Sequence, residues 1–272
     1  MNPEAAVATG LAKAFQRAKA ESRAAIIGYL PAGFPDQKTS IRIIQEMINS
    51  GVDMVEVGIP YSDPVMDGPV ICQAAEIALA QGTTTDHALD VVAAVASGDA
   101  AILVMSYWNL IASYGEQRFA TELAARGGAG VITPDLTPEE GGDWIAACDS
   151  QSLAHIFLAA PSSSEQRLRV VAAASTGFVY ATALMGVTGV RTGVGDSAPE
   201  LVQRLRSVTQ TPVAVGLGVS TGDQARTVGQ FADGVIVGSA FVRRVLEADN
   251  ADHAVAQVGE LAAELVAAVA GR

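Results

Sequence analysis

Acidic residues gather where an apolar segment runs into a proline-containing loop. In VEVGIPYSDPVMDGP (55–69), Glu56 lies among apolar residues, whereas Asp63 and Asp67 lie in the loop that follows. A carboxyl group that points into an apolar cavity loses hydration, so its pKa rises and it can act as an acid or a base near neutral pH. A carboxylate in a more solvated loop can stay ionised and stabilise positive charge. The segment therefore predicts that Glu56 and an acid of the loop divide a proton-transfer reaction between them.

Both kinds of acid also have a purely structural explanation. Glu56 could form an ion pair with a Lys or Arg, and Asp63, which precedes Pro64, could cap a turn. The lysines of this chain are Lys13, Lys19 and Lys38. None of them stands at the end of a predicted strand, and the arginines fall mostly in predicted helices or after Gly189. Because an unpaired buried acid is costly, its presence favours a functional role for Glu56.

Short β-branched or apolar segments recur along the chain and predict the strands that must position these acids. They are Ala24–Leu30, Asp53–Ile59, Ala101–Tyr107, Gly130–Thr133, His155–Ala160, Gly177–Thr182, Pro212–Gly218 and Asp233–Ser239. Segments with helical spacing lie between them, among them Ser40–Ser50, Glu116–Arg126, Glu165–Ala174, Pro199–Val208 and Thr221–Phe231. Such alternation predicts right-handed βαβ units and a parallel sheet.

About eight such units in 272 residues predict a (β/α)8 TIM barrel that forms a single domain over residues 1–272. An extra N-terminal helix over 10–21 is expected to cap the bottom of the barrel, and 240–270 to close its ring. An open doubly wound sheet is the alternative. It usually carries a G-x-G-x-x-G sequence after its first strand, and GYLPAGFP does not match that pattern.

Composition narrows the class of partner. Half of the residues are hydrophobic, the formal net charge is −12 and the pI is about 4.6. An acidic protein is poorly suited to nucleic acid or an anionic membrane, because both need clustered Lys and Arg. Cys72 and Cys148 lie far apart, which fits a reducing, cytoplasmic location without disulfides. No signal peptide is recognised, and Val170–Val190, although uncharged, is interrupted by Gly, Ser and Thr and is not expected to span a membrane.

The inventory of reactive residues excludes some chemistries. No lysine is available at a strand end for a Schiff base, and His87, His155 and His253 stand apart from one another, which disfavours a metal site. Proton transfer by carboxylates remains. Glycines cluster at three further strand ends, in MGVTG (185–189), GLGVS (216–220) and GSAF (238–241). Barrels often bind a substrate phosphate at such places through backbone N–H groups, although tight turns alone also require glycine.

The segment that opens on Glu56 resembles the signature of the tryptophan synthase α subunit family. The similarity continues in order through GYLPAGFPD, MSYWNLIASYG, ITPDLTPEE, FLAAPSSS, MGVTGVR, VGLGVS and DGVIVGSAFV. It implies a (β/α) barrel that cleaves indole-3-glycerol phosphate to indole and glyceraldehyde 3-phosphate without a cofactor, in tryptophan biosynthesis. It also implies that Glu56 protonates indole C3 and later takes the glycerol hydroxyl proton, while Asp67 holds the indole N–H and stabilises the indolenine.

The same resemblance assigns the binding residues. Those implied for the phosphate are Gly189, Gly218, Gly238 and Ser239, and Thr188 resembles a lid residue that meets Asp67. The residues implied for the indole pocket are Tyr29, Met105, Ile132, Leu158, Tyr180 and Leu217. For this second set, ordinary barrel core is an equally good explanation.

The family implies a partner, a tryptophan synthase β subunit in an αββα complex, faced by loops Tyr61–Met66 and Trp108–Tyr114. A stand-alone indole-releasing lyase and a non-catalytic regulatory barrel are the alternatives. The second would be expected to lack Glu56 or Asp67, and both are present. The chain departs from the family pattern at Leu184, where many relatives have Arg, and at Cys72, where they often have Gln. We expect neither departure to abolish the chemistry.

Overall fold

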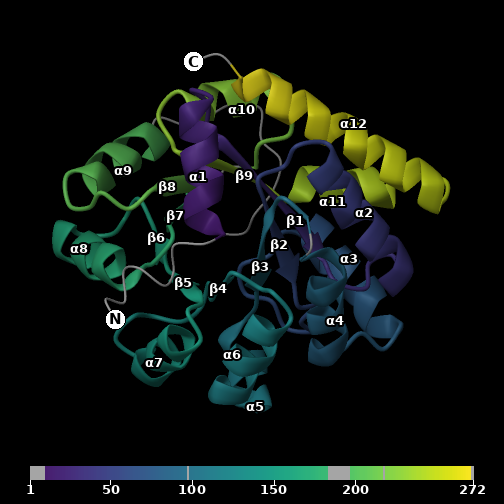
Figure 1. Cartoon of the computed structure of the whole chain (residues 1–272), viewed down its shortest axis with the longest axis horizontal. Coiled ribbons are helices and arrows are strands. Elements are labelled where there is room, and N and C mark those ends of the chain that lie inside the picture. Colours follow the sequence, from purple (N-terminus) through teal and green to yellow (C-terminus); the bar gives the residue numbers. More distant parts are fainter. Residues whose placement is uncertain (1–9, 97, 183–196, 217, 271–272) are drawn as a thin grey trace.

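Parallel strands form a closed ring at the centre of the molecule (Figure 1). The computed structural model describes residues 10–96, 98–182, 197–216 and 218–270. The strands are β1 (Ala25–Pro31), β2 (Met54–Gly58), β3 (Ala101–Met105), β4 (Gly130–Ile132), β5 (Ala154–Ile156), β6 (Leu158–Ala159), β7 (Val179–Thr182), β8 (Val213–Gly216) and β9 (Gly234–Val237). They pair in the order β5-β4-β3-β2-β1-β9-β8-β7-β6.

The strands β5 and β6 are two halves of one predicted strand. The β5 half pairs with β4 and the β6 half pairs with β7, so together they close the ring. The break falls at Phe157, whose N–H is donated to the Ser175 hydroxyl, 3.2 Å away, instead of to a neighbouring strand. The ring therefore contains the eight predicted strands, and the TIM-barrel prediction is confirmed.

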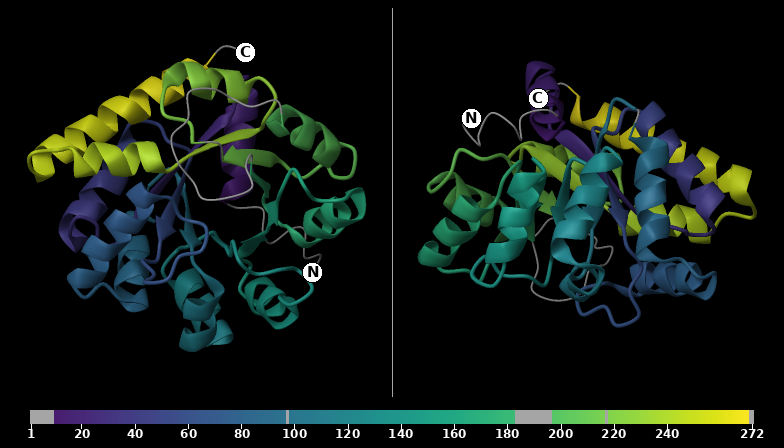
Figure 2. Two further views of the ribbon diagram at one scale, coloured as in Figure 1. Left: turned by 180° about the vertical axis from the view of Figure 1, so that it is seen from behind. Right: turned by 60° about the horizontal axis from the view of Figure 1, so that its bottom comes forward.

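Helices surround the ring on its outside (Figure 2). They are α1 (Leu11–Ala20), α2 (Gln37–Asn49), α3 (Pro69–Ala80), α4 (Thr85–Val95), α5 (Trp108–Tyr114), α6 (Glu116–Ala125), α7 (Gly142–Ser150), α8 (Glu165–Ala174), α9 (Ser197–Arg206), α10 (Gly222–Gly229), α11 (Ser239–Leu246) and α12 (Ala251–Val269). All five predicted helices between strands are present. The predicted element 240–270 is divided into α11 and α12, because Asn250 caps a new helix by accepting a hydrogen bond from the His253 N–H.

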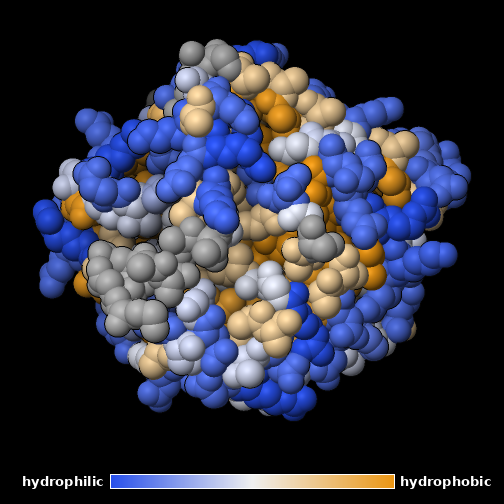
Figure 3. Space-filling model, viewed as in Figure 1, coloured by the Kyte–Doolittle hydropathy of each residue, from blue (hydrophilic) through white to orange (hydrophobic). Residues whose placement is uncertain are grey.

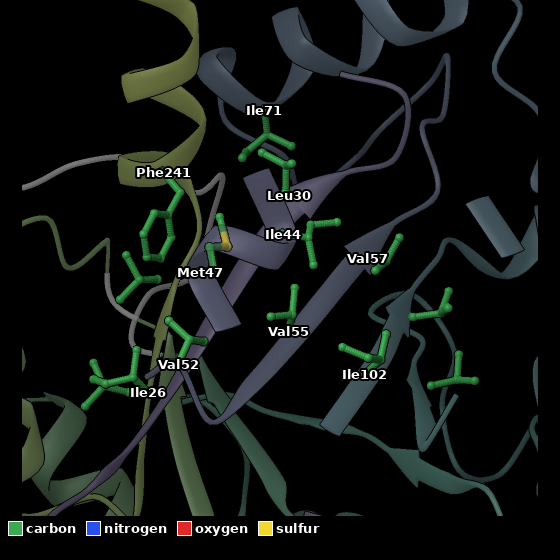
Figure 4. Close-up of a cluster of buried hydrophobic side chains, with 14 of the residues drawn as sticks. Ile26, Leu30, Ile44, Met47, Val52, Val55, Val57, Ile71, Ile102 and Phe241 are labelled. Carbon is green, nitrogen blue, oxygen red and sulfur yellow. The ribbon is translucent and has the colours of Figure 1, made fainter. Parts of the chain in front are cut away.

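Alternate strand residues face the helices and form the outer core. Val55 and Val57 of β2 and Ile26 and Leu30 of β1 pack with residues of α2 and α11, as Figure 4 shows. Because side chains alternate along a strand, the residues between them must face the inside of the ring. Glu56 is therefore aimed into the barrel by the same alternation that buries Val55 and Val57 outside it.

The interior of the ring forms a second core, and α1 closes its lower end. Leu11, Ala14, Phe15 and Ala18 of α1 pack against the first inward-facing residues of the strands. These residues include Ala25, Met54, Ala101 and Ala154, which all stand at the N-terminal ends of their strands. The helix thus plugs the barrel at the end opposite the loop that carries Asp67, as predicted.

A buried ion pair secures the same end. Asp53 is 0% exposed and its carboxylate accepts hydrogen bonds from Arg23 at 2.6 and 2.8 Å, from Arg17 at 2.8 Å and from the Ile26 N–H at 2.9 Å. The hydrogen bond of Asp53 raises the pKa of Arg23 above its ordinary value. Asp53 therefore joins α1, β1 and β2 at the bottom of the barrel.

Replacing Asp53 with Ala is expected to lower the free energy of unfolding by about 3–5 kcal/mol, because the buried guanidinium of Arg23 loses its buried partner and keeps only the half-exposed Glu21. Urea denaturation provides the measurement. The control is Asp252→Ala, which removes the exposed partner of Arg42, 2.6 Å away, and should cost less than about 1 kcal/mol. Equal effects of the two substitutions would contradict the structural role of Asp53.

The outer surface carries both hydrophilic and hydrophobic residues. On the face shown in Figure 3, hydrophilic residues cover most of the rim and hydrophobic residues show in patches between them. Within the described residues, no helix is long and apolar enough to cross a membrane. The uncharged stretch that begins at Val170 forms the end of α8 and then β7. Cys72 and Cys148 are both free thiols.

Candidate active site

Glu56 lies inside the upper half of the barrel. It is 1% exposed, and its register neighbours are Tyr29 of β1 and Leu103 of β3. Its Oε1 atom has no hydrogen-bond partner among the described residues, and it belongs to none of their ion pairs. Burial raises the pKa of Glu56 to about 8. The alternative of a structural ion pair with a described Lys or Arg does not apply, and the carboxyl group is a neutral acid at pH 7.

Asp67 lies in the loop that joins β2 to α3 and is half-buried. Burial raises the pKa of Asp67 to about 6, and a hydrogen bond from the Tyr107 hydroxyl partly offsets that rise. Asp67 is therefore mostly ionised at pH 7. The two acids differ in charge at the same pH because one is sealed inside the ring and the other reaches it from a solvated loop.

Tyr29 and Tyr180 both lie within electrostatic range of the two acids. The pKa of each phenol is raised by burial and by the charges of both Glu56 and Asp67. A group affected by both carboxylates lies close to both, so these four side chains share one region at the upper end of the barrel. This places two predicted pocket residues beside the predicted acids.

Glycines leave room for the two tyrosine rings. A Cβ atom at Gly58 would lie 2.7 Å from Cζ of Tyr29, and one at Gly216 would lie 2.6 Å from the hydroxyl of Tyr180. Real Cβ contacts are not this short, so any larger residue would displace the rings. Gly58 stands two residues after the inward-facing Glu56, and Gly216 stands two residues after the inward-facing Ala214. Because neither glycine has a side chain, each determines how far the tyrosine ring next to it can extend over the site.

Gly58→Ala is expected to lower the free energy of unfolding by about 1–3 kcal/mol and to reduce turnover, because the Tyr29 ring must move away from its place beside Glu56. Chemical denaturation and steady-state kinetics provide the two readouts. Gly142→Ala in α7 is the matched control, since nothing lies within 4 Å of its added Cβ. A Gly58→Ala protein that is as stable and active as Gly142→Ala would contradict this packing role.

The remaining predicted pocket residues face the interior at different depths. Ile132 is fully buried in the inner core, whereas Met105 and Leu158 pack against that core and stay partly exposed. Leu158 is the register neighbour of Tyr180, and Met105 is that of Gly58. Leu217 lies outside the described residues. Met105, Leu158 and the two tyrosines thus form an apolar lining around the acids, and Ile132 lies beneath it.

The predicted phosphate residues that are described lie at the C-terminal ends of β8 and β9. Gly218 has a φ of +70°, and Gly238 is the N-cap of α11, with no side chain capping the helix. Ser239 is the first residue of α11 and is buried. A Cβ on Gly238 would lie 3.5 Å from Tyr29, so this helix start borders the same region. Thr188, Gly189 and Leu184 lie outside the described residues.

Other candidates have structural roles. The Asp63 carboxylate is exposed and accepts a hydrogen bond from the neighbouring Ser62 hydroxyl, which is typical of a turn. His87 and His253 lie in the first turns of α4 and α12, and His155 is buried with its Nε2 3.1 Å from Asp149. No group of His, Cys, Asp and Glu residues within the described ranges is suited to hold a metal ion.

Tyr107 and Cys72 also interact with the loop around Asp67. The Tyr107 hydroxyl accepts a hydrogen bond from the Met66 N–H at 3.0 Å and lowers the pKa of Asp67. Tyr107 is not among the site residues predicted from the sequence. The only signal was its place at a predicted strand end. The Cys72 thiol, where the family often has Gln, lies 3.5 Å from the Asp67 carbonyl oxygen and can donate to it.

The fold and these residues define a (β/α)8 barrel with one neutral and one ionised carboxyl group at the C-terminal end of its strands. The family model described as tryptophan synthase alpha chain matches residues 15–270. The tryptophan synthase alpha chain of Thermobifida fusca is 56% identical over 264 residues, covering 96% of this chain and 98% of the relative. That of Acidothermus cellulolyticus is 51% identical, with coverage of 96% and 97%.

Solved structures agree with the sequence comparison. A structure of Mycobacterium tuberculosis tryptophan synthase superimposes with a TM-score of 0.91 at 46% identity, covering 96% of this chain and 98% of that one. The chain belongs to the tryptophan synthase alpha chain family. This membership confirms the resemblance and the predicted activity, which is the lyase reaction on indole-3-glycerol phosphate in tryptophan biosynthesis.

Proposed function

We propose that Glu56 and Asp67 carry out the cleavage of indole-3-glycerol phosphate by acid–base catalysis. Neutral Glu56 donates its proton to C3 of the indole ring, and the resulting positive indolenine is stabilised by ionised Asp67 at the ring N–H. Glu56, now ionised, takes the proton of the glycerol hydroxyl next to the scissile bond. The C3–carbon bond then breaks, its electron pair restores the indole ring, and an aldehyde, glyceraldehyde 3-phosphate, is released.

The observation that carries this proposal is the buried carboxyl group of Glu56 in the upper half of the barrel, whose pKa is about 8 and whose Oε1 atom has no hydrogen-bond partner among the described residues. A group that first gives and then takes a proton works best when its pKa lies near the operating pH. Asp67, with a pKa of about 6, supplies the negative charge that the indolenine requires.

Binding residues complete the proposal. Tyr29, Met105, Leu158 and Tyr180 would contact the indole ring, with Ile132 supporting them from below and Leu217 as a further member of this pocket. The phosphate would be held by backbone N–H groups at Gly189, Gly218, Gly238 and Ser239. The start of α11 supports this, because a helix N-terminus favours an anion even in an acidic protein. Thr188 would close over Asp67, and no cofactor is expected.

A tryptophan synthase β subunit is the proposed partner, in an αββα complex. The loops Tyr61–Met66 and Trp108–Tyr114 would meet it, and the exposure of Val65 (71%) in the first of these loops supports a contact surface there. A cytoplasmic location fits the free thiols. The assignment of residues 1–272 to a single domain stays a prediction.

The rate should depend on pH in a bell-shaped manner. Cleavage requires Asp67 ionised and Glu56 protonated, so kcat/KM should rise as the pH passes about 6 and fall as it passes about 8. Measuring indole release from pH 5 to 9.5 tests this. The alkaline limb is diagnostic for Glu56, because a substrate phosphate titrates near pH 6 and only affects the acid limb. A rate that stays level up to pH 9.5 would contradict the assignment of Glu56 as the acid.

The proposed function is tested by assaying indole formation from indole-3-glycerol phosphate, with the chain alone and with a β subunit. Indole release that a β subunit strongly accelerates is the expected result. Equal rates with and without the partner would instead support a stand-alone lyase. An absence of indole in both assays would refute the proposed catalytic roles.

A further inference from the structure

The Tyr107 side chain links the site's third strand to the loop that carries Asp67. Tyr107 is 6% exposed and stands two residues beyond the end of β3. Its hydroxyl oxygen accepts a hydrogen bond from the Met66 N–H at 3.0 Å, and the same hydroxyl lies close enough to the Asp67 carboxylate to lower the pKa of Asp67. One hydroxyl group can do both at once. The hydroxyl of Tyr107 thus interacts with two consecutive residues of the β2–α3 loop, Met66 and Asp67.

Tyr107 is itself held firmly. The preceding Ser106 N–H is donated to the Ile132 carbonyl oxygen at 3.1 Å, and the following Trp108 N–H is donated to Oδ1 of Asp135 at 2.9 Å. The Tyr61 ring lies against the Tyr107 ring, with centroids 5.2 Å apart. The β4 strand and its loop therefore fix the position of Tyr107, and Tyr107 in turn fixes the neighbouring loop.

The loop needs such an anchor. Ser62, Asp63 and Val65 are exposed, and Asp67 is only half-buried, so little packing holds this segment against the barrel. A carboxylate that must face Glu56 across a ligand has to be placed accurately, because small misplacements in an active site cost large factors in rate.

We propose that Tyr107 is a positioning residue, whose hydroxyl sets the place of Asp67 opposite Glu56 by holding the loop backbone at Met66, the residue directly before Asp67. This proposal rests on the proposed function. It makes Tyr107 act through Asp67 and not on the substrate. The hydroxyl also favours the ionised form of Asp67, because a hydroxyl donor interacts more strongly with a carboxylate than with the neutral acid.

The test is Tyr107→Phe, which keeps the ring and removes the hydroxyl. We expect kcat for indole formation to fall about 10- to 100-fold with KM changed less than about 3-fold, as for the loss of a hydrogen bond to a charged group. The acid limb of the pH profile should move upward by about half a pH unit or more, because Asp67 loses a hydrogen bond that favours its charge. Asp86→Ala is the control. It removes the acceptor of the Tyr114 hydroxyl, 2.5 Å away, outside the strand ring.

A double substitution separates positioning from general damage. If Tyr107 acts through Asp67, adding Tyr107→Phe to Asp67→Asn should lower kcat less than 3-fold further, because coupled residues are not additive. Fully additive losses, or a Tyr107→Phe enzyme with the wild-type rate and pH profile, would overturn the proposal. Should Tyr107→Phe not fold, Asp135→Ala loosens the same anchor at Trp108, and it must shift the acid limb in the same direction for the proposal to stand.

Failure of the proposed function would be seen separately. If the wild-type chain released no indole, the catalytic roles would fall, but the contact would still be measurable by a carboxyl ¹³C NMR titration of Asp67. A higher Asp67 pKa in Tyr107→Phe than in the wild type supports the anchoring contact. Equal values would overturn it.

Discussion

Glu56→Gln is expected to lower kcat for indole release by about 10²- to 10⁴-fold, the usual contribution of a general acid or base. Gln has the shape of the neutral carboxyl group but has no proton of suitable acidity to transfer to indole C3. Binding of the substrate phosphate should change little, since its proposed contacts lie at Gly218 and at the start of α11. Turnover within 10-fold of the wild type would refute the role of Glu56.

At high pH, Glu56→Gln should be more stable than the wild type. This result would show that a loss of activity comes from the missing proton and not from a loss of folding. The pKa of Glu56 is about 8 in the folded chain against 4.5 as its ordinary value, so the unfolded state holds the proton less tightly. A raised carboxyl pKa means that wild-type stability falls as the pH rises from about 4.5 to about 8. The free energy of unfolding of Glu56→Gln relative to wild type should therefore increase by roughly 3–5 kcal/mol between pH 4.5 and pH 8.5.

Urea denaturation at the two pH values measures this difference, with Glu165→Gln as the control, an exposed residue of α8 that pairs with Arg204. Its relative stability should change by less than about 1 kcal/mol, because an exposed ion pair contributes little. A pH-independent difference for Glu56→Gln would mean that the carboxyl group is not buried as a neutral acid.

Asp67→Asn is expected to lower kcat by about 10²- to 10³-fold, the range for removing one electrostatic stabiliser of a charged intermediate. An amide can still accept a hydrogen bond from the indole N–H, so KM should change far less than kcat. The acid limb near pH 6 in kcat should also disappear, since the group that must ionise is gone.

Steady-state kinetics from pH 5 to 8 test this prediction, and Asp143→Asn in the first turn of α7 is the matched control. That residue is exposed and lies outside the strand ring. If Asp67→Asn retained the wild-type rate, Glu56 would have to work without a charged partner, and the division of roles proposed for the two acids would be wrong.

Most of the architecture could be predicted from the sequence, because each element leaves a local pattern. The β2 strand is recognisable from its apolar residues, and the alternation that buries Val55 and Val57 outside also points Glu56 inward. Helix α8 was predicted with the bounds that the structure has, since Ser164 caps its start. The division of one strand into β5 and β6 was not predictable, because it depends on Ser175, a residue of a different segment, taking the Phe157 N–H.

The candidate site divides in the same way. The types of the two acids and their separation by a stiff loop are visible in VEVGIPYSDPVMDGP, and the family pattern names them. The hydrogen bonds of Tyr107 are not visible there, because Met66 and Asp67 are 41 and 40 positions away along the chain. Nor does the sequence show that Gly58 makes room for the Tyr29 ring, which comes from the adjacent strand.

The sequence by itself determined the barrel, the family and the two acids that we propose as catalytic, because strand periodicity and residue type are local properties. Only the tertiary structure decided the charge state of those acids. Closure of the ring removes water from Glu56 and raises its pKa to about 8, while the Tyr107 hydroxyl at a neighbouring strand end partly offsets the rise that burial causes in the pKa of Asp67. Desolvation and hydrogen bonding depend on what surrounds a group in space, and that is set by which distant segments the fold brings together.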